Sequence, residues 1–143
     1  MLALHSNPSL LSVVRGAVER LTEILGYPLA QCRSITRAVD EALTNILRHS
    51  YGNRLDRPIT MYFRKAQRRQ NRQIENGLEI VLCDRGPAVD PSKFLGRPLE
   101  EIRPGGLGLH FIRQAMDTVE FTRRGPTNRL RLVKYLTKTS NTR

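Results

Sequence analysis

The stretch Glu41-Ala42-Leu43-Thr44-Asn45 is the most informative part of this chain. Its carboxylate and its amide are four residues apart, so a helix places both on one face. Two later segments carry related chemistry: Asp84-Arg85-Gly86 follows an apolar run, and Gly105-Gly106-Leu107-Gly108-Leu109 precedes a helical pattern. A carboxylate after a strand and glycines before a helix, in this order, predict a nucleotide site.

Each of these segments also has a simpler interpretation. The amide of Asn45 suits Mg²⁺ and the carboxylate of Glu41 can accept a proton from a hydroxyl, but the same helix face could merely be solvated. Asp84 could accept the exocyclic amine of a purine, or it could form a turn with Gly86. Free amides at the glycine cluster favour phosphate, although glycines also form ordinary loops.

The length of 143 residues predicts one domain over residues 1–143. Two isolated cysteines, Cys32 and Cys83, are typical of reduced thiols rather than of a disulfide framework. No apolar run reaches the roughly 18 residues that span a bilayer, and the N-terminus lacks a secretion signal, so we expect no membrane association and a cytoplasmic protein.

The chain is strongly basic, with 24 Lys and Arg against 13 Asp and Glu, a net charge of +11 and a pI near 10.8. Such a surplus indicates an anionic partner, which could be nucleic acid, an acidic protein or anionic lipid. One group of cations lies in a polar stretch that contains no acid: Arg64, Lys65, Arg68, Arg69 and Arg72. A solvated loop is the simpler interpretation of this group.

Apolar spacing predicts a helix over residues 11–25 that ends at Gly26, and a second helix that begins at Pro28 and ends before Gly52. A third helical pattern covers residues 106–117. The strand-like segments are residues 59–64, 78–84, 118–123 and 130–136. We expect the basic connection between the first two strands to be mobile, and residues 85–104 to form a long functional loop.

The combination resembles the ATP-binding domain shared by histidine kinases, gyrase and MutL. Within that superfamily it is most similar to the bacterial anti-sigma factors that are also serine protein kinases. The resemblance extends over nearly the whole chain, and the matching segments are residues 38–45, 49–51, 105–109 and 116–117. It implies an α/β two-layer sandwich, in which helices cover one face of a mixed sheet and a glycine-flanked loop closes over the triphosphate.

The resemblance also implies roles for individual residues. Glu41 would be the general base for the substrate serine, Asn45 would bind Mg²⁺, and Asp84 would accept the adenine amine of ATP beside Gly86. The remaining contacts to the nucleotide would come from Arg48, Arg103, Gly105, Gly106, Leu107 and Gly108. The chain departs from the family at Ala88, where the adenine motif usually has its last glycine, and in its strong basicity.

We therefore expect an Mg·ATP-dependent serine protein kinase that phosphorylates an anti-sigma antagonist and sequesters a sigma factor, with a homodimer as an open alternative. A second hypothesis is a nucleotide-responsive switch that binds its partner without catalysis. A third is a basic nucleic-acid-binding domain. We disfavour direct nucleic-acid binding because the chain has just four Phe and four Tyr, and several of them fall at apparent core positions.

Overall fold

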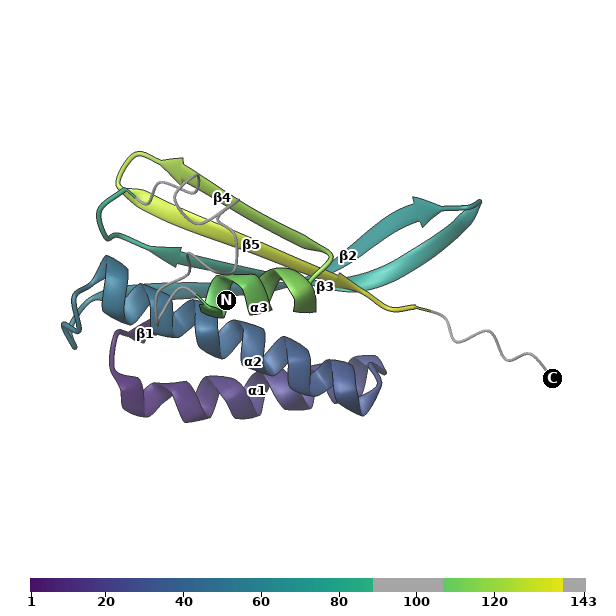
Figure 1. The fold of residues 1–143 in the computed structure, drawn as a ribbon, viewed down its shortest axis with the longest axis horizontal. Coiled ribbons are helices and arrows are strands. Elements are labelled where there is room, and N and C mark those ends of the chain that lie inside the picture. The colour runs from purple at the N-terminus through teal and green to yellow at the C-terminus, as the bar shows by residue number, and fades with distance from the viewer. Residues whose placement is uncertain (89–106, 138–143) are drawn as a thin grey trace.

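The computed structural model describes residues 1–88 and 107–137, and it arranges them in two layers (Figure 1). One layer is a five-stranded sheet with the strand order β1-β2-β3-β5-β4, and helices pack on one of its faces. The helices are α1 (Leu11–Leu25), α2 (Leu29–Asn45) and α3 (Leu107–Ala115). The strands are β1 (Leu2–His5), β2 (Pro58–Gln70), β3 (Gln73–Asp84), β4 (Thr118–Arg124) and β5 (Thr127–Tyr135). The predicted two-layer sandwich is confirmed.

Local sequence determines where the first helices begin and end. The side chain of Asn7 accepts a hydrogen bond from the backbone amide of Ser9, and the short helix Pro8–Leu10 then leads into α1. Gly26 ends α1 in the left-handed conformation, with φ of 90°, which a glycine adopts without steric cost. Both predicted helices therefore lie where the apolar spacing placed them.

Helix α2 does not end at Asn45 but continues as a π-helical segment, Ile46–Ser50. Ile46 and Leu47 within this segment are buried in the core, whereas Arg48 and His49 are exposed. Wider π-helical turns are rare and often occur at functional sites. The segment lies directly after the residues that the sequence singled out.

The four strand pairings among the described residues are all antiparallel, whereas a mixed sheet was expected. Strands β3 and β4 are connected through α3 and run in the same direction. Strand β5 lies between them and pairs with both, so the two parallel strands never become neighbours. The short strand β1, which the sequence analysis did not predict, pairs with β2 at the edge of the sheet.

The basic connection between β2 and β3 is not the mobile loop that we expected. Both strands continue into it and pair in register as far as Gln70 and Gln73, so that a two-residue turn joins them. The two turn residues, Asn71 and Arg72, have φ of 50° and 62°, as a type I′ hairpin requires. The hairpin projects well beyond the helices as an arm, which we define as residues 64–77 (Figure 1).

The core lies between the helices and the covered face of the sheet. Its largest fully buried side chains include Ile35 and Leu43 from α2, Ile80 and Leu82 from β3, and Ile112 from α3. Cys32 is buried and Cys83 is half-buried, and both are free thiols, as the sequence predicted. In the described ranges no helix is long and apolar enough to cross a membrane.

Candidate functional site

The start of α3 lies against the face of α2 that carries Glu41. A β-carbon built on Gly108 would lie 2.6 Å from Oε2 of Glu41, which is closer than real side chains approach. One turn earlier along α2, the guanidinium of Arg37 lies 4.0 Å from the ring centroid of Phe111. The two helices therefore run antiparallel here, and a larger residue at position 108 would require the flexible carboxylate of Glu41 to move.

Asn45 is the last residue of α2 and lies one turn beyond Glu41 on the same helix. Both side chains are half-buried, and no hydrogen bond to either side chain is found within residues 1–88 and 107–137. Their oxygens are thus free of protein donors in the described part of the chain. Arg48 follows in the π-helical segment and is exposed to solvent.

Asp84, at the end of β3, is only 6% exposed and is held by hydrogen bonds. One of its oxygens, Oδ1, accepts the backbone amide of Gly86 at 2.9 Å and the side-chain amide of Asn128 at 3.0 Å. Asn128 lies opposite Asp84 on β5, and its own Oδ1 accepts a hydrogen bond from Arg123 at 2.8 Å. A buried carboxylate needs such donors, because desolvation penalises its charged form.

The turn after Asp84 packs against the end of the helical layer. A β-carbon on Gly86 would lie 2.6 Å from Cβ of Ser50 and 2.7 Å from its carbonyl oxygen, so this position requires glycine. The hydroxyl of Tyr51 accepts the backbone amide of Arg85 at 2.7 Å and donates to the carbonyl of Pro58. Burial raises the pKa of Tyr51 above its usual value, which keeps this hydroxyl a donor.

The structure packs the described part of the third predicted segment against the first, and the second against the π-helical segment that follows the first. Glu41 lies beside Gly108 of α3, and Gly86 packs against Ser50 at the end of the π-helical segment. Leu107 is the first residue of α3. Three further predicted ligands, Arg103, Gly105 and Gly106, lie outside the described residues.

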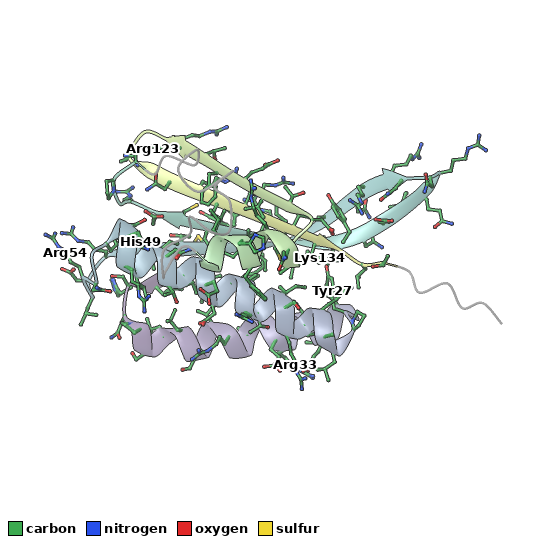
Figure 2. The ribbon with its side chains drawn as sticks, viewed as in Figure 1. Tyr27, Arg33, His49, Arg54, Arg123 and Lys134 are labelled. Atoms are coloured by element: carbon green, nitrogen blue, oxygen red, sulfur yellow. The ribbon has the colours of Figure 1, made fainter. Side chains whose placement is uncertain are left out.

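Sequence reasoning missed Asn128, Arg123 and Tyr51, which fix the turn after Asp84. Asn128 is 44 residues from Asp84, and only the strand register makes them partners. Figure 2 shows Arg123 and His49 at the same end of the molecule, away from Tyr27 and Lys134. The polar residues Asn128 and Arg123 flank a hairpin turn, and nothing in their spacing distinguishes them from turn residues.

Comparison with known proteins resolves the family. A family model described as the histidine kinase-like ATPase domain matches residues 4–134. The chain belongs to this family. The predicted assignment to the histidine kinase-like ATPase superfamily is therefore confirmed. The family is one of ATPase domains, so the predicted ATP-binding domain is confirmed as a property of the family.

Several relatives within this ATPase family are protein kinases by name. A serine-protein kinase RsbW from Halalkalibacterium halodurans is 32% identical over 118 residues, which cover 76% of this chain and 65% of that protein. The serine/threonine-protein kinase BtrW of Bordetella bronchiseptica is 29% identical over 106 residues, covering 71% and 69%. This chain thus spans slightly less than two thirds of the length of the first relative and slightly more than two thirds of the length of the second.

Among solved structures, this chain matches the histidine kinase domain of a blue-light activated histidine kinase from Erythrobacter litoralis. The two chains share 16% sequence identity with a TM-score of 0.49, and the match covers 88% of this chain and 59% of that one.

Proposed function

We propose that this chain is an ATP-dependent serine protein kinase that uses Mg²⁺. The family is an ATPase domain family, and relatives matched over most of the chain carry the name serine-protein kinase. The observation that carries the proposal is the position of Glu41, whose carboxylate lies beside Gly108 at the start of α3 and one turn before Asn45. This arrangement places a candidate base, a candidate metal ligand and a helix start within one small region.

Glu41 would accept the proton of the substrate serine hydroxyl. Its carboxylate has no hydrogen-bond donor among the described residues, so it is available to a substrate. The start of α3 lies beside this carboxylate, and the unpaired amides of a helix N-terminus would favour the phosphates of a nucleotide there. Asn45 would contribute its side-chain oxygen to a magnesium ion that reaches the site with the nucleotide phosphates.

Asp84 would hold the adenine amine of ATP. Gly86 and Asn128 both donate to Oδ1, and the other carboxylate oxygen has no protein donor in the part of the chain that the structure describes. A purine amine is a donor that fits this remaining oxygen. When bound, Mg·ATP supplies the phosphoryl group, and positioning together with charge neutralisation provides most of the rate acceleration in such transfers.

Arg48 and the amides near Gly108 would contact the phosphates, together with Arg103, Gly105, Gly106 and Leu107. The protein substrate would be an anti-sigma antagonist, and the chain would also bind a sigma factor in the cytoplasm. These partners follow from the resemblance described above, whereas the names of the relatives support the kinase activity. Both partners are proteins that the kinase must bind over surfaces outside the nucleotide site.

The proposal is tested with purified protein, γ-labelled ATP and the antagonist encoded beside its gene. We expect label on one serine of the antagonist, transferred only in the presence of magnesium, and mass spectrometry locates that serine. Label that stays on ATP while the antagonist still binds in an ATP-dependent manner would contradict the kinase and favour the nucleotide-responsive switch.

A further inference from the structure

The arm is a rigid extension rather than a loose loop. At its base, Gly77 leaves room for Tyr135, since a β-carbon there would lie 2.9 Å from the tyrosine ring and 2.5 Å from the carbonyl of Lys134. The ring of Tyr135 in turn lies 4.1 Å from the guanidinium of Arg68. Arg68 also pairs with Glu75 across the hairpin at 2.8 Å. These contacts and the two-residue turn hold the arm in one shape.

The two faces of the arm differ in charge. Arg68 and Glu75 lie on the open face of the sheet, on which Arg131 also pairs with Glu79 at 2.7 Å. The opposite face is the side of the helices, because Leu78, which pairs with Lys65, belongs to the core beneath them. That face carries Lys65, Gln67, Arg69, Ile74 and Asn76 and no acid.

The cations of the helix-side face are unneutralised. No carboxylate lies within ion-pair distance of Lys65 or Arg69 in residues 1–88 and 107–137, and both side chains are exposed. Ile74, the cross-strand partner of Arg69, is 52% exposed. An exposed aliphatic side chain beside an unpaired cation suits a protein surface with acidic and apolar groups.

The arm also has an open edge. Strand β1 pairs with β2 only as far as Met61, so residues 62–70 have no neighbour on that side within the described chain. Every second residue of such an edge directs its backbone N–H and C=O outward. An extended peptide can satisfy these groups as an added strand, whereas nucleic acid offers no strand to pair.

We propose that the open edge of β2 at residues 62–70 binds an extended acidic segment of a partner protein as an additional strand. Side chains four apart on an added strand point to the same face. Two acids at that spacing would therefore meet Lys65 and Arg69. The arm projects away from the end of α2 and the start of α3 (Figure 1), and this inference does not rest on the proposed kinase activity.

Fluorescence anisotropy with a designed probe tests this site. The probe is a labelled peptide about nine residues long that alternates valine and threonine and carries two glutamates four apart. One control peptide has lysines in place of the glutamates, and a second is N-methylated at alternate amides. The protein is tested as wild type, as the double variant Lys65→Glu/Arg69→Glu, and as the control Arg33→Glu/Arg124→Glu, which changes the net charge equally through exposed arginines on α2 and β4.

We expect the acidic peptide to bind wild type and the control variant alike, and the arm variant to bind at least about tenfold more weakly. The lysine and N-methylated peptides should not bind, and amide exchange should slow within residues 62–70 when the acidic peptide binds. ATP affinity should be equal in all three proteins.

Equal binding of the N-methylated peptide would refute strand addition, and tighter binding of duplex DNA than of peptide would make the arm a nucleic-acid site. Absence of peptide binding at low salt would mean that the cations only protect the edge from aggregation.

Discussion

Gly108 and Glu41 approach each other so closely that a β-carbon at position 108 would lie 2.6 Å from Oε2 of the carboxylate. The contact joins the start of α3 to the face of α2 that carries Asn45. It gives Gly108 a steric reason to be glycine that is independent of any phosphate. A methyl group at position 108 would therefore require the carboxylate of the proposed base to move.

Gly108→Ala should displace the carboxylate of Glu41 and slow phosphoryl transfer, while the protein stays folded because alanine favours helices. Activity against the antagonist, measured together with thermal unfolding, checks this. Gly16→Ala is the matched control, since a β-carbon there meets nothing within 4 Å. The control should keep full activity and gain about 0.5–1 kcal/mol of stability. Equal activity in both variants would show that the contact does not matter.

Glu41→Gln preserves the size of the side chain but removes its ability to accept a proton. General-base catalysis contributes about 10²- to 10⁴-fold, so we expect a loss of that order in the transfer rate with nearly normal ATP affinity. Single-turnover transfer and calorimetric titration separate the two effects. A variant that transfers phosphate at the wild-type rate would remove Glu41 from the mechanism.

Asn128→Ala should weaken ATP binding through Asp84, because the carboxylate loses the donor that lies 3.0 Å from its Oδ1. The buried groups left without partners should also lower the free energy of unfolding by about 1–3 kcal/mol. Asn76→Ala, at an exposed amide that bonds to Gln67 at the base of the arm, is the control. The role assigned to Asn128 fails if the two variants bind ATP equally well.

Tyr27 should make stability depend on pH in the alkaline range. Burial raises the pKa of Tyr27 from 10.0 to about 12, and its hydroxyl donates to the carbonyl of Lys134 at 2.6 Å. Because the folded pKa lies above the unfolded one, this contribution is complete below pH 10 and is lost as the pH rises towards 12.

Denaturant unfolding of wild type and Tyr27→Phe at about pH 9 and about pH 11 measures this effect. Wild type should lose more stability between the two conditions, since phenylalanine has no proton to release. Lysines titrate in both proteins and cancel in the comparison. Parallel losses in the two proteins would contradict the assignment.

Much of the fold could be predicted because its apolar spacing is regular. The helix that ends at Gly26 and the helix that contains Glu41 have strong periodicity and clear end residues, and both predictions are confirmed. The outer part of the arm was missed because its strands contain few apolar residues. Pairs such as Arg68 with Glu75 stabilise it instead, and the turn at Asn71 and Arg72 lacks the usual glycine.

The candidate site was predictable where its residues are close in sequence, as with Glu41 and Asn45. Asn128 could not be predicted, because strand register alone brings it to Asp84. The sequence suggested Gly86 as part of a turn or as a neighbour of the adenine amine, and the structure adds that the backbone of Ser50 already requires glycine there. Sequence spacing shows which residues share an element, and only the packing of elements shows which of them touch.

The central claim is that the end of α2 binds Mg·ATP through Asn45, and calorimetric titration tests it most directly. Wild type and Asn45→Ala are titrated with ATP in magnesium and again in an excess of chelator. We predict that magnesium strengthens ATP binding to wild type and that Asn45→Ala loses most of this gain, since an amide oxygen is a suitable magnesium ligand. Equal ATP affinities of the two proteins in magnesium would contradict the site.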